Sequence, residues 1–239
     1  MTKSLMRSHQ ASEPMSDYKP DYNIDIVFCV DLSSSMKNSM AWVKSRLLEV
    51  PNILIRCIAE RDRTCHIRSR IVTFGSSQSE VSHLEEPTFR TSLSEYDSTN
   101  HIHEVQQLNV GSELGDTALA LASLDRAINS NWSARGILQR HIIMVFTNHA
   151  DIVETHNQMR KSSEVATNRN HLLKELRNKW ESIIRPEGRR LLIFAPDAYP
   201  WNGIGDSWDH TLYLPSDSLG ANLSGYEFET MIDMCFRAQ

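Results

Sequence analysis

The chain has 239 residues, of which 40% are hydrophobic and 23% are charged, and its formal net charge is -5. This length suits one globular domain with a sizeable core, and this charge gives no electrostatic basis for binding nucleic acid. The apolar runs are too short to span a bilayer.

The first residues, 1–21, are rich in Ser, Pro, Lys and Asp and show no hydrophobic periodicity. We expect a flexible N-terminal arm without a secretory signal, followed by a single domain over residues 22–239. Buried free thiols explain the cysteines best, which favours a reducing, cytoplasmic environment. A structural zinc is not supported, because no Cys/His pair has a second pair at a useful spacing. The four cysteines are Cys29, Cys57, Cys65 and Cys235.

The first predicted element is a buried strand over Ile24–Val30, which is apolar except for Asp25. A run this short and this apolar is typical of a strand covered on both faces in a parallel sheet. The strand stops at Asp31, and Ser33 and Ser35 follow at steps of two. In a loop that leaves a strand end such alternate side chains can converge, and their carboxylate and hydroxyl oxygens suit Mg²⁺. The simpler alternative is a serine-rich turn that caps the next helix.

The Asp31-x-Ser33-x-Ser35 spacing, after a buried strand and before a helix, resembles the metal-ion-dependent adhesion site of von Willebrand factor A (vWA) domains. The resemblance covers most of the chain, and the sequence is similar to stand-alone intracellular bacterial domains that include the tellurite-resistance group. It implies a bound Mg²⁺, or Mn²⁺ or Ca²⁺ in its place, with an open coordination position that takes a carboxylate from a partner protein.

Four further elements are expected before the second candidate loop. A helix with a regular apolar stripe should run from about Met36 to Ile58, and Pro51 should kink or break it. The others are a less buried strand over Ile67–Phe74, a short edge strand over Thr88–Leu93 and a short helix over His101–Leu108.

The second candidate loop, Gly111–Thr117, leads into a helix that ends near Asn129. In vWA domains a loop of this kind supplies a threonine to the metal. The resemblance places either Ser112 or Glu113 at that position, depending on the alignment, and both side chains carry oxygens that suit a hard cation. The alternative is that Ser112 or Asp116 only caps the helix.

The third candidate loop follows a strongly apolar strand over His141–Thr147. In vWA domains an aspartate of the metal site comes next, whereas this chain has Asn148. The amide keeps an oxygen donor but removes a negative charge, for which Asp151 can compensate if the loop folds back. The resemblance therefore implies a degenerate metal site. His149, in the same loop, is expected to contact the partner.

The segment Pro196–Asp209 is expected to be a long loop that carries Trp201 and Trp208. Exposed aromatic side chains in a loop can anchor a partner protein, and the alternative is a lid that packs on the sheet. The remaining expected elements are a polar connection over Ile152–Val165 with a role in specificity, a helix over Leu172–Ile184, a buried strand over Leu191–Ala195, an edge strand over Thr211–Leu214 and a helix over Phe228–Phe236.

The alternation of strands and helices from Ile24 onward predicts an α/β fold with a doubly wound, mostly parallel sheet and helices on both faces. The vWA resemblance adds one antiparallel edge strand. In open α/β sheets ligands bind beyond the carboxyl ends of the strands, where the strand order reverses. The three candidate loops are therefore predicted to meet at that edge.

The function that follows is a metal-dependent adaptor, which binds an acidic group of another protein. The resemblance suggests an ATPase, kinase or phosphatase of the same system as that partner. The first alternative is a metal-independent scaffold with a decayed site. A metal-dependent hydrolase that uses Asp31 and Asp151 is a less favoured alternative. A serine hydrolase and a nucleotide-binding protein are not supported, because the sequence contains no Gly-x-Ser-x-Gly and no glycine-rich nucleotide-binding motif.

Overall fold

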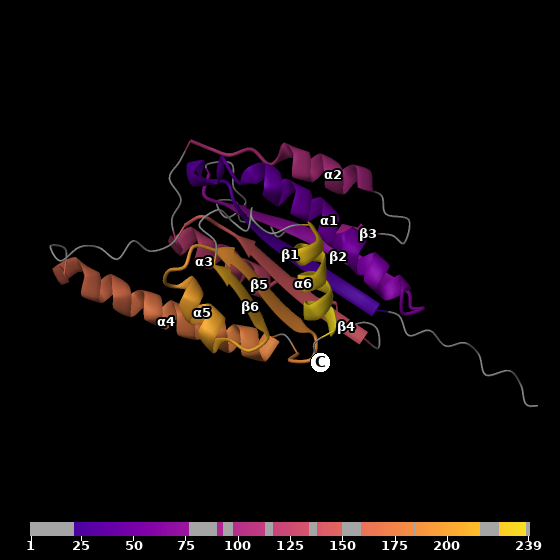
Figure 1. Cartoon of the computed structure of the whole chain (residues 1–239). Helices are drawn as coiled ribbons and strands as arrows, with labels where there is room; N and C mark the ends of the chain where they lie inside the picture. The colour runs from indigo at the N-terminus through magenta and orange to yellow at the C-terminus, as the bar shows by residue number, and fades with distance from the viewer. Residues whose placement is uncertain are drawn as a thin grey trace, which may run out of the picture.

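The computed structural model describes residues 22–76, 90–92, 98–112, 117–133, 138–149, 159–183, 185–215 and 225–237. Within these residues one sheet has the strand order β3-β2-β1-β4-β5-β6 (Figure 1). All neighbouring pairs are parallel except β2 and β3, which are antiparallel. The predicted doubly wound α/β fold is confirmed, including its antiparallel edge strand. The strands are β1 Tyr22–Asp31, β2 Cys65–Phe74, β3 Arg90–Ser92, β4 Leu138–Phe146, β5 Arg189–Ala195 and β6 Thr211–Pro215.

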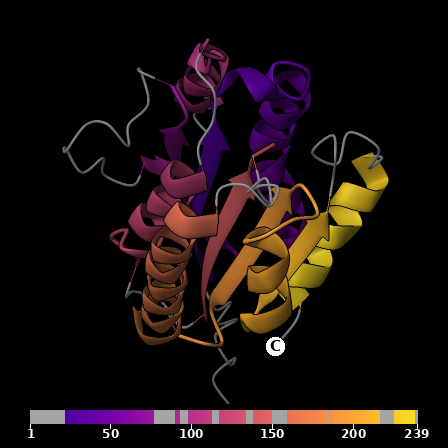
Figure 2. The same cartoon turned by 90° about the vertical axis from the view of Figure 1, so that its left-hand side faces the viewer.

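The helices divide between the two faces of the sheet. On one face lie α1 (Met40–Ala59), α2 (Ser98–Gln107) and α6 (Gly225–Arg237), and their apolar side chains share a core with β1, β4 and β5. On the other face lie α3 (Thr117–Ile128), α4 (Met159–Ile183) and α5 (Trp201–Ser207). Figure 2 shows α4 and α6 on opposite sides of the sheet. Among the described helices, none is both long and apolar enough to cross a membrane.

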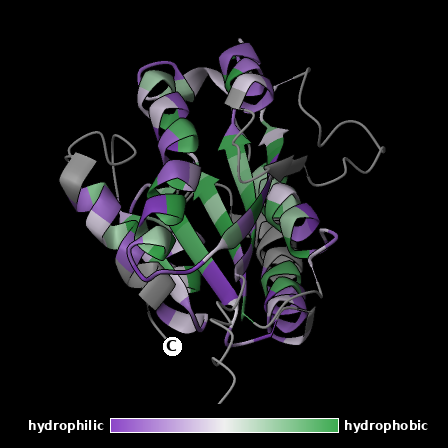
Figure 3. Ribbon diagram, turned by 90° about the vertical axis from the view of Figure 1, so that its right-hand side faces the viewer, coloured by the Kyte–Doolittle hydropathy of each residue, from purple (hydrophilic) through white to green (hydrophobic). Residues whose placement is uncertain are grey.

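The strand β1 explains why the sequence has a continuous apolar run. Its alternate residues Ile26 and Phe28 face the core under α1, whereas Val27 and Cys29 face the core under α3, and all four are fully buried. Both faces of this strand are covered, so neither set of positions tolerates polar side chains. Figure 3 shows the same distribution as hydrophobic strands between helices with hydrophilic outer surfaces.

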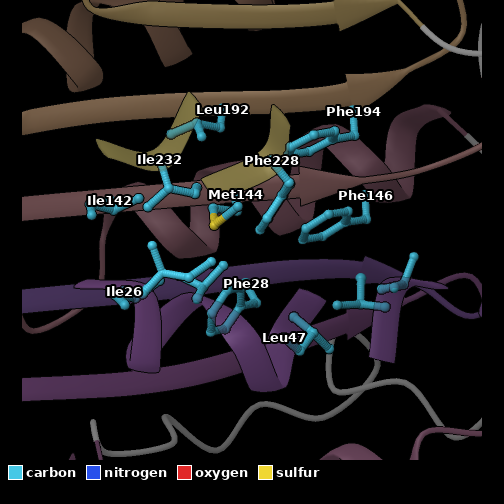
Figure 4. Close-up of a cluster of buried hydrophobic side chains, with 14 of the residues drawn as sticks. Ile26, Phe28, Leu47, Ile142, Met144, Phe146, Leu192, Phe194, Phe228 and Ile232 are labelled. Carbon is cyan, nitrogen blue, oxygen red and sulfur yellow. The ribbon is translucent and has the colours of Figure 1, made fainter. Parts of the chain in front are cut away.

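The core under α1 and α6 is rich in aromatic rings from neighbouring strands. Phe146 of β4 and Phe194 of β5 stack with their ring centroids 4.9 Å apart, and Phe228 of α6 lies 6.1 Å from Phe194 (Figure 4). Offset and tilted ring contacts of this kind add to the free energy that apolar burial supplies. This packing fixes the ends of β4 and β5 relative to one another.

The order of the strands places a topological switch point between β1 and β4. From β1 the chain crosses over to β2 on one side, and from β4 it crosses to β5 on the other side. The carboxyl ends of both strands lie at one edge, since the two strands are parallel and in register from Tyr22 with Leu138 to Val30 with Phe146. Ligands of open α/β sheets bind at such a point.

Of the two outcomes predicted at Pro51, the break is wrong, because α1 continues through the proline, and the kink stays a prediction. A proline at this position leaves the carbonyl of Leu47 without its helical donor. The ring of His101 on α2 supplies the missing partner, since its Nε2 donates to the Leu47 carbonyl over 3.1 Å. Helix α1 also begins later than predicted, at Met40, after a short 3₁₀ turn over Ser34–Met36.

Two connections near the C-terminal end differ from expectation. Helix α4 begins at Met159 and extends beyond the sheet (Figure 1), so the second half of the expected loop Ile152–Val165 is helical. Residues 152–158 lie outside the described residues. The segment expected to be a long loop over Pro196–Asp209 contains helix α5. The other expected strands and helices are confirmed within a few residues.

Candidate metal centre

The candidate centre is built around the carboxylate of Asp31, the last residue of β1, which is fully buried. Its Oδ1 accepts a hydrogen bond from the backbone N–H of Ser33 over 2.8 Å. Its Oδ2 accepts one from the hydroxyl of Thr147, just after β4, over 2.9 Å. The backbone N–H of His149 donates in turn to that hydroxyl oxygen over 3.0 Å. Asp31 therefore ties together the loops that leave β1 and β4.

The hydroxyls of Ser33 and Ser35 lie side by side, with their oxygens 2.8 Å apart. The Ser33 side chain is fully buried, whereas Ser35 is exposed. The intervening 3₁₀ turn brings the two alternate side chains together, as their spacing in the sequence predicts. The pair places two neutral hydroxyl oxygens in the loop that follows the buried carboxylate of Asp31.

Asn148 completes the cluster from the end of β4. Its Nδ2 donates to the carbonyl of Ser35 over 3.1 Å and to the hydroxyl of Ser39 over 3.3 Å. These bonds fix the amide, and they leave its Oδ1 buried without a hydrogen-bond partner. An unsatisfied buried acceptor of this kind costs about 1–3 kcal/mol.

Two glycines allow the loops to approach the carboxylate. Gly75, at the end of β2, has a φ of +82°, and a Cβ added there would lie 2.6 Å from Oδ1 of Asp31. Gly111 donates its N–H to the carbonyl of Leu32 over 2.7 Å, which places the second candidate loop beside the first. A Cβ on Gly111 would lie 2.9 Å from Cβ of Ser76, whose buried hydroxyl has no hydrogen-bond partner.

The structure brings together four of the predicted site residues: Asp31, Ser33, Ser35 and Asn148. Ser112 is exposed and directly follows the residue that contacts the first loop. Glu113 and Asp151 lie outside the described residues, so the choice between Ser112 and Glu113 stays a prediction.

Sequence reasoning missed several residues that support the cluster. Thr147 holds the Asp31 carboxylate, Ser39 holds the Asn148 amide, and Gly75 leaves room for Asp31. Thr147 and Gly75 each follow a strand that adjoins β1, which would have predicted their approach to Asp31. The sequence alone does not show which strands adjoin β1, so this prediction requires the strand order. Ser39, at the start of α1, has no comparable signal, because its role depends on the approach of Asn148.

The expectation that the two tryptophans are exposed anchors is wrong. Trp201 is fully buried and Trp208 is 6% exposed, and both pack in the core under α3 and α4. The alternative, a lid packed on the sheet, is confirmed. Trp201 also donates from Nε1 to the carbonyl of His149 over 2.7 Å, so it holds the loop after β4 from behind. His149 itself is half-buried, and its contact with a partner stays a prediction.

The cluster consists of oxygen and amide groups, and its acidic content is low among the described residues. Within the described residues, no group of three or more His, Cys, Asp and Glu side chains is placed so that it could hold a metal ion. Hydroxyl, amide and carboxylate oxygens are the ligands that Mg²⁺ and Ca²⁺ prefer. Among the described residues of the cluster, the buried carboxylate of Asp31 carries the negative charge.

The chain was also compared with known proteins. No protein-family model matches it, and no curated protein matches it. Its function therefore has to be inferred from the side chains that the fold brings to this edge of the sheet.

Proposed function

We propose that this chain is an interaction module of the vWA type, which holds Mg²⁺ or a similar hard cation at the carboxyl edge of its sheet and presents it to an acidic side chain of a partner protein. The observation that carries the proposal is the convergence of the Asp31 carboxylate, the paired hydroxyls of Ser33 and Ser35, and Asn148 at one edge of the sheet. The antiparallel edge strand β3 is a feature that the resemblance implies, and it supports the proposal further.

In this proposal each residue of the cluster has a distinct role. Ser33, Ser35 and Asn148 offer neutral oxygens to the cation, and Asp31 balances its charge from within the protein. A cation with few anionic protein ligands stays strongly attractive to an incoming carboxylate, because little of its charge is neutralised in advance. The replacement of an acidic residue by Asn148 therefore weakens the affinity for the metal and strengthens the attraction of any bound metal for the partner's acid.

The partner implied is a protein that exposes an Asp or Glu, for which the resemblance suggests an ATPase, kinase or phosphatase of the same system. Cytoplasmic location belongs to the same proposal. In this proposal the rim that such a partner would contact consists of the half-buried His149, which follows Asn148, and the exposed Ser112, whose neighbour Gly111 is hydrogen-bonded to Leu32.

Calorimetric titration with Mg²⁺ and Mn²⁺ tests the metal site. Ser35→Ala removes an exposed hydroxyl from the cluster, and we expect it to weaken metal binding at least about tenfold, which corresponds to roughly 1.4 kcal/mol. Ser34→Ala is the matched control, because it removes a hydroxyl from the same turn but lies outside the cluster, and its affinity should equal that of the wild type. Flat titrations with the wild-type protein would refute the metal site.

The scaffold alternative has one observation in its favour. Both oxygens of the Asp31 carboxylate already accept a hydrogen bond from the protein, so the cluster is held together without a metal. A pull-down from cell extract in Mg²⁺ and in EDTA separates the two functions. A partner that is retained only in Mg²⁺ supports the metal-dependent module, whereas one retained equally in EDTA supports the scaffold.

A further inference from the structure

Helix α5 carries the one Asn-Gly pair in the sequence, Asn202–Gly203. Asparagine is a chemically labile residue, because the backbone nitrogen of the next residue can close a five-membered ring on its side-chain amide carbon. Glycine at the next position leaves this nitrogen unshielded, since it has no Cβ, and it gives the backbone the conformational freedom that ring closure requires. The pair is therefore a candidate site of covalent change.

The two groups that react already face one another in the folded protein. The backbone N–H of Gly203 donates to Oδ1 of Asn202 over 2.8 Å. A C=O bond is about 1.23 Å long, so Cγ of Asn202 lies at most about 4 Å from the Gly203 nitrogen. Productive reacting distances are about 3–3.5 Å. The attacking nitrogen and the carbon that it attacks are thus held close to the reacting distance.

The surroundings of the pair leave room for the reaction. Gly203 is exposed and Asn202 is half-buried, so solvent reaches both residues. A Cβ built on Gly203 would meet nothing closer than the ring of Tyr199, at 3.9 Å. Helix α5 restrains the backbone rotation that ring closure needs, but Asn202 is only its second residue, and the ends of helices fray. Two glycines in this short helix weaken the restraint further.

Other exposed asparagines of the chain lack this arrangement and serve as references. Asn129 is followed by serine and Asn109 by valine, so a Cβ shields the next backbone nitrogen in both. The side-chain amide of Asn129 donates to the carbonyl of Asp125 over 2.8 Å, and that of Asn109 donates to the carbonyl of Gln107 over 3.0 Å. Exposure alone therefore does not distinguish Asn202, whereas the contact with Gly203 does.

We propose that Asn202 is a site of spontaneous deamidation, in which the Gly203 nitrogen attacks Cγ of Asn202 and forms a succinimide. Solvent hydroxide removes the proton of this nitrogen, the N–Cγ bond forms, and the Cγ–Nδ2 bond breaks as Nδ2 takes a proton from water and leaves as ammonia. Water then adds to either ring carbonyl and opens the ring, which leaves aspartate or isoaspartate at position 202. The net reaction consumes water, releases ammonia and involves no oxidation or reduction.

The change reaches the candidate metal centre through Trp201, the neighbour of Asn202. Trp201 donates from Nε1 to the carbonyl of His149 and so supports the loop after β4. Either product adds a negative charge beside Trp201, and the isoaspartyl product also inserts the side-chain methylene into the backbone. Deamidation therefore alters the support of this loop without changing a residue of the cluster, and it does not depend on a bound metal.

Mass spectrometry of the native full chain during incubation in mildly alkaline buffer tests the proposal. A protease that cleaves before aspartate releases residues 197–205, in which Asn202 is the one asparagine, and deamidation raises the mass of this peptide by about 1 Da. The same protease also cleaves before the aspartyl product but not before the isoaspartyl product, so the two are counted separately.

We expect Asn202 to convert at least about tenfold faster than Asn129 and Asn109 in the native protein, and faster still as the pH rises. Equal rates at the three asparagines would overturn the proposal. Conversion of Asn202 that occurs in urea but not in the native protein would overturn it as well, because the folded helix would then protect the pair.

Gly203→Ala provides the variant that removes the reactive pair. Its new Cβ meets nothing closer than 3.9 Å, so the variant should fold. We expect it to slow the conversion of Asn202 at least about tenfold, because the methyl group shields the nitrogen and restricts the backbone, and to leave the rate at Asn129 unchanged. A wild-type rate at Asn202 in this variant would show that the Gly203 nitrogen is not the attacking group and would overturn the proposal.

Discussion

Replacement of Gly75 by alanine probes the contact on which the candidate metal centre depends. Gly75 has a φ of +82°, and the new Cβ would lie 2.6 Å from Oδ1 of Asp31 and 3.3 Å from Cβ of Ser33. The left-handed backbone costs an L-residue about 1 kcal/mol, and the steric conflict with a buried group adds a similar or larger amount, so we expect a loss of about 3 kcal/mol in the free energy of unfolding.

Urea unfolding followed by circular dichroism measures this loss, and Gly203→Ala is its matched control. A Cβ on Gly203 would meet nothing closer than 3.9 Å, and the residue lies in helix α5, where alanine is preferred to glycine. We expect Gly203→Ala to be neutral or to stabilise the protein by up to about 1 kcal/mol. Equal stabilities of the two variants would refute the close approach of β2 to Asp31, and with it the geometry of the cluster.

Three further outcomes follow from buried contacts. His101→Phe should lower the free energy of unfolding by about 1–2 kcal/mol, because it removes the hydrogen-bond donor from the Leu47 carbonyl, which Pro51 leaves without its helical partner. Much of this loss should disappear in the Pro51→Ala background, where the backbone N–H of residue 51 supplies the donor. Additive losses of the two substitutions in urea unfolding would contradict this coupling. The Cys29 thiol is fully buried, which raises its pKa to about 12, so it should react with a disulfide reagent only after unfolding, and rapid labelling of the native protein would contradict its position. Trp201→Phe should lower the free energy of unfolding by about 2 kcal/mol, part of it from the lost hydrogen bond to the His149 carbonyl after β4. Proteolysis of the loop that follows β4 should become faster. An unchanged digestion rate would argue against a role of Trp201 in holding this loop.

Much of the fold was predictable because the sheet imposes a simple pattern on its strands. Ile24–Val30, His141–Thr147 and Leu191–Ala195 are continuous apolar runs, and all three became parallel strands buried on both faces. The failures occurred where local signals conflict. The glycine-rich segment after Pro196 reads as a loop, yet it forms α5, because burial of Trp201 and Ile204 against the sheet outweighs weak helix propensity.

The candidate site was predictable only in part. The spacing of Asp31, Ser33 and Ser35 at a strand end was sufficient to expect a cluster of oxygens, and the fold adds Asn148 to it. The role of Trp201 was not predictable from the residues around it in the sequence, since an aromatic residue in a polar segment can point to solvent or to the core. Its burial depends on the packing of α5 against β5 and β6, which are set by residues elsewhere in the chain.

By itself the sequence determined which segments form strands, which faces of the helices are buried, and that polar oxygens follow the first strand. These properties depend on the period of apolar residues along the chain, which is local information. The tertiary structure decided which polar groups meet: Thr147 with Asp31, His101 with the carbonyl beside Pro51, and Arg68 with Asp25. Each of these contacts joins residues that are distant in sequence, and each follows from the order in which strands and helices are laid side by side.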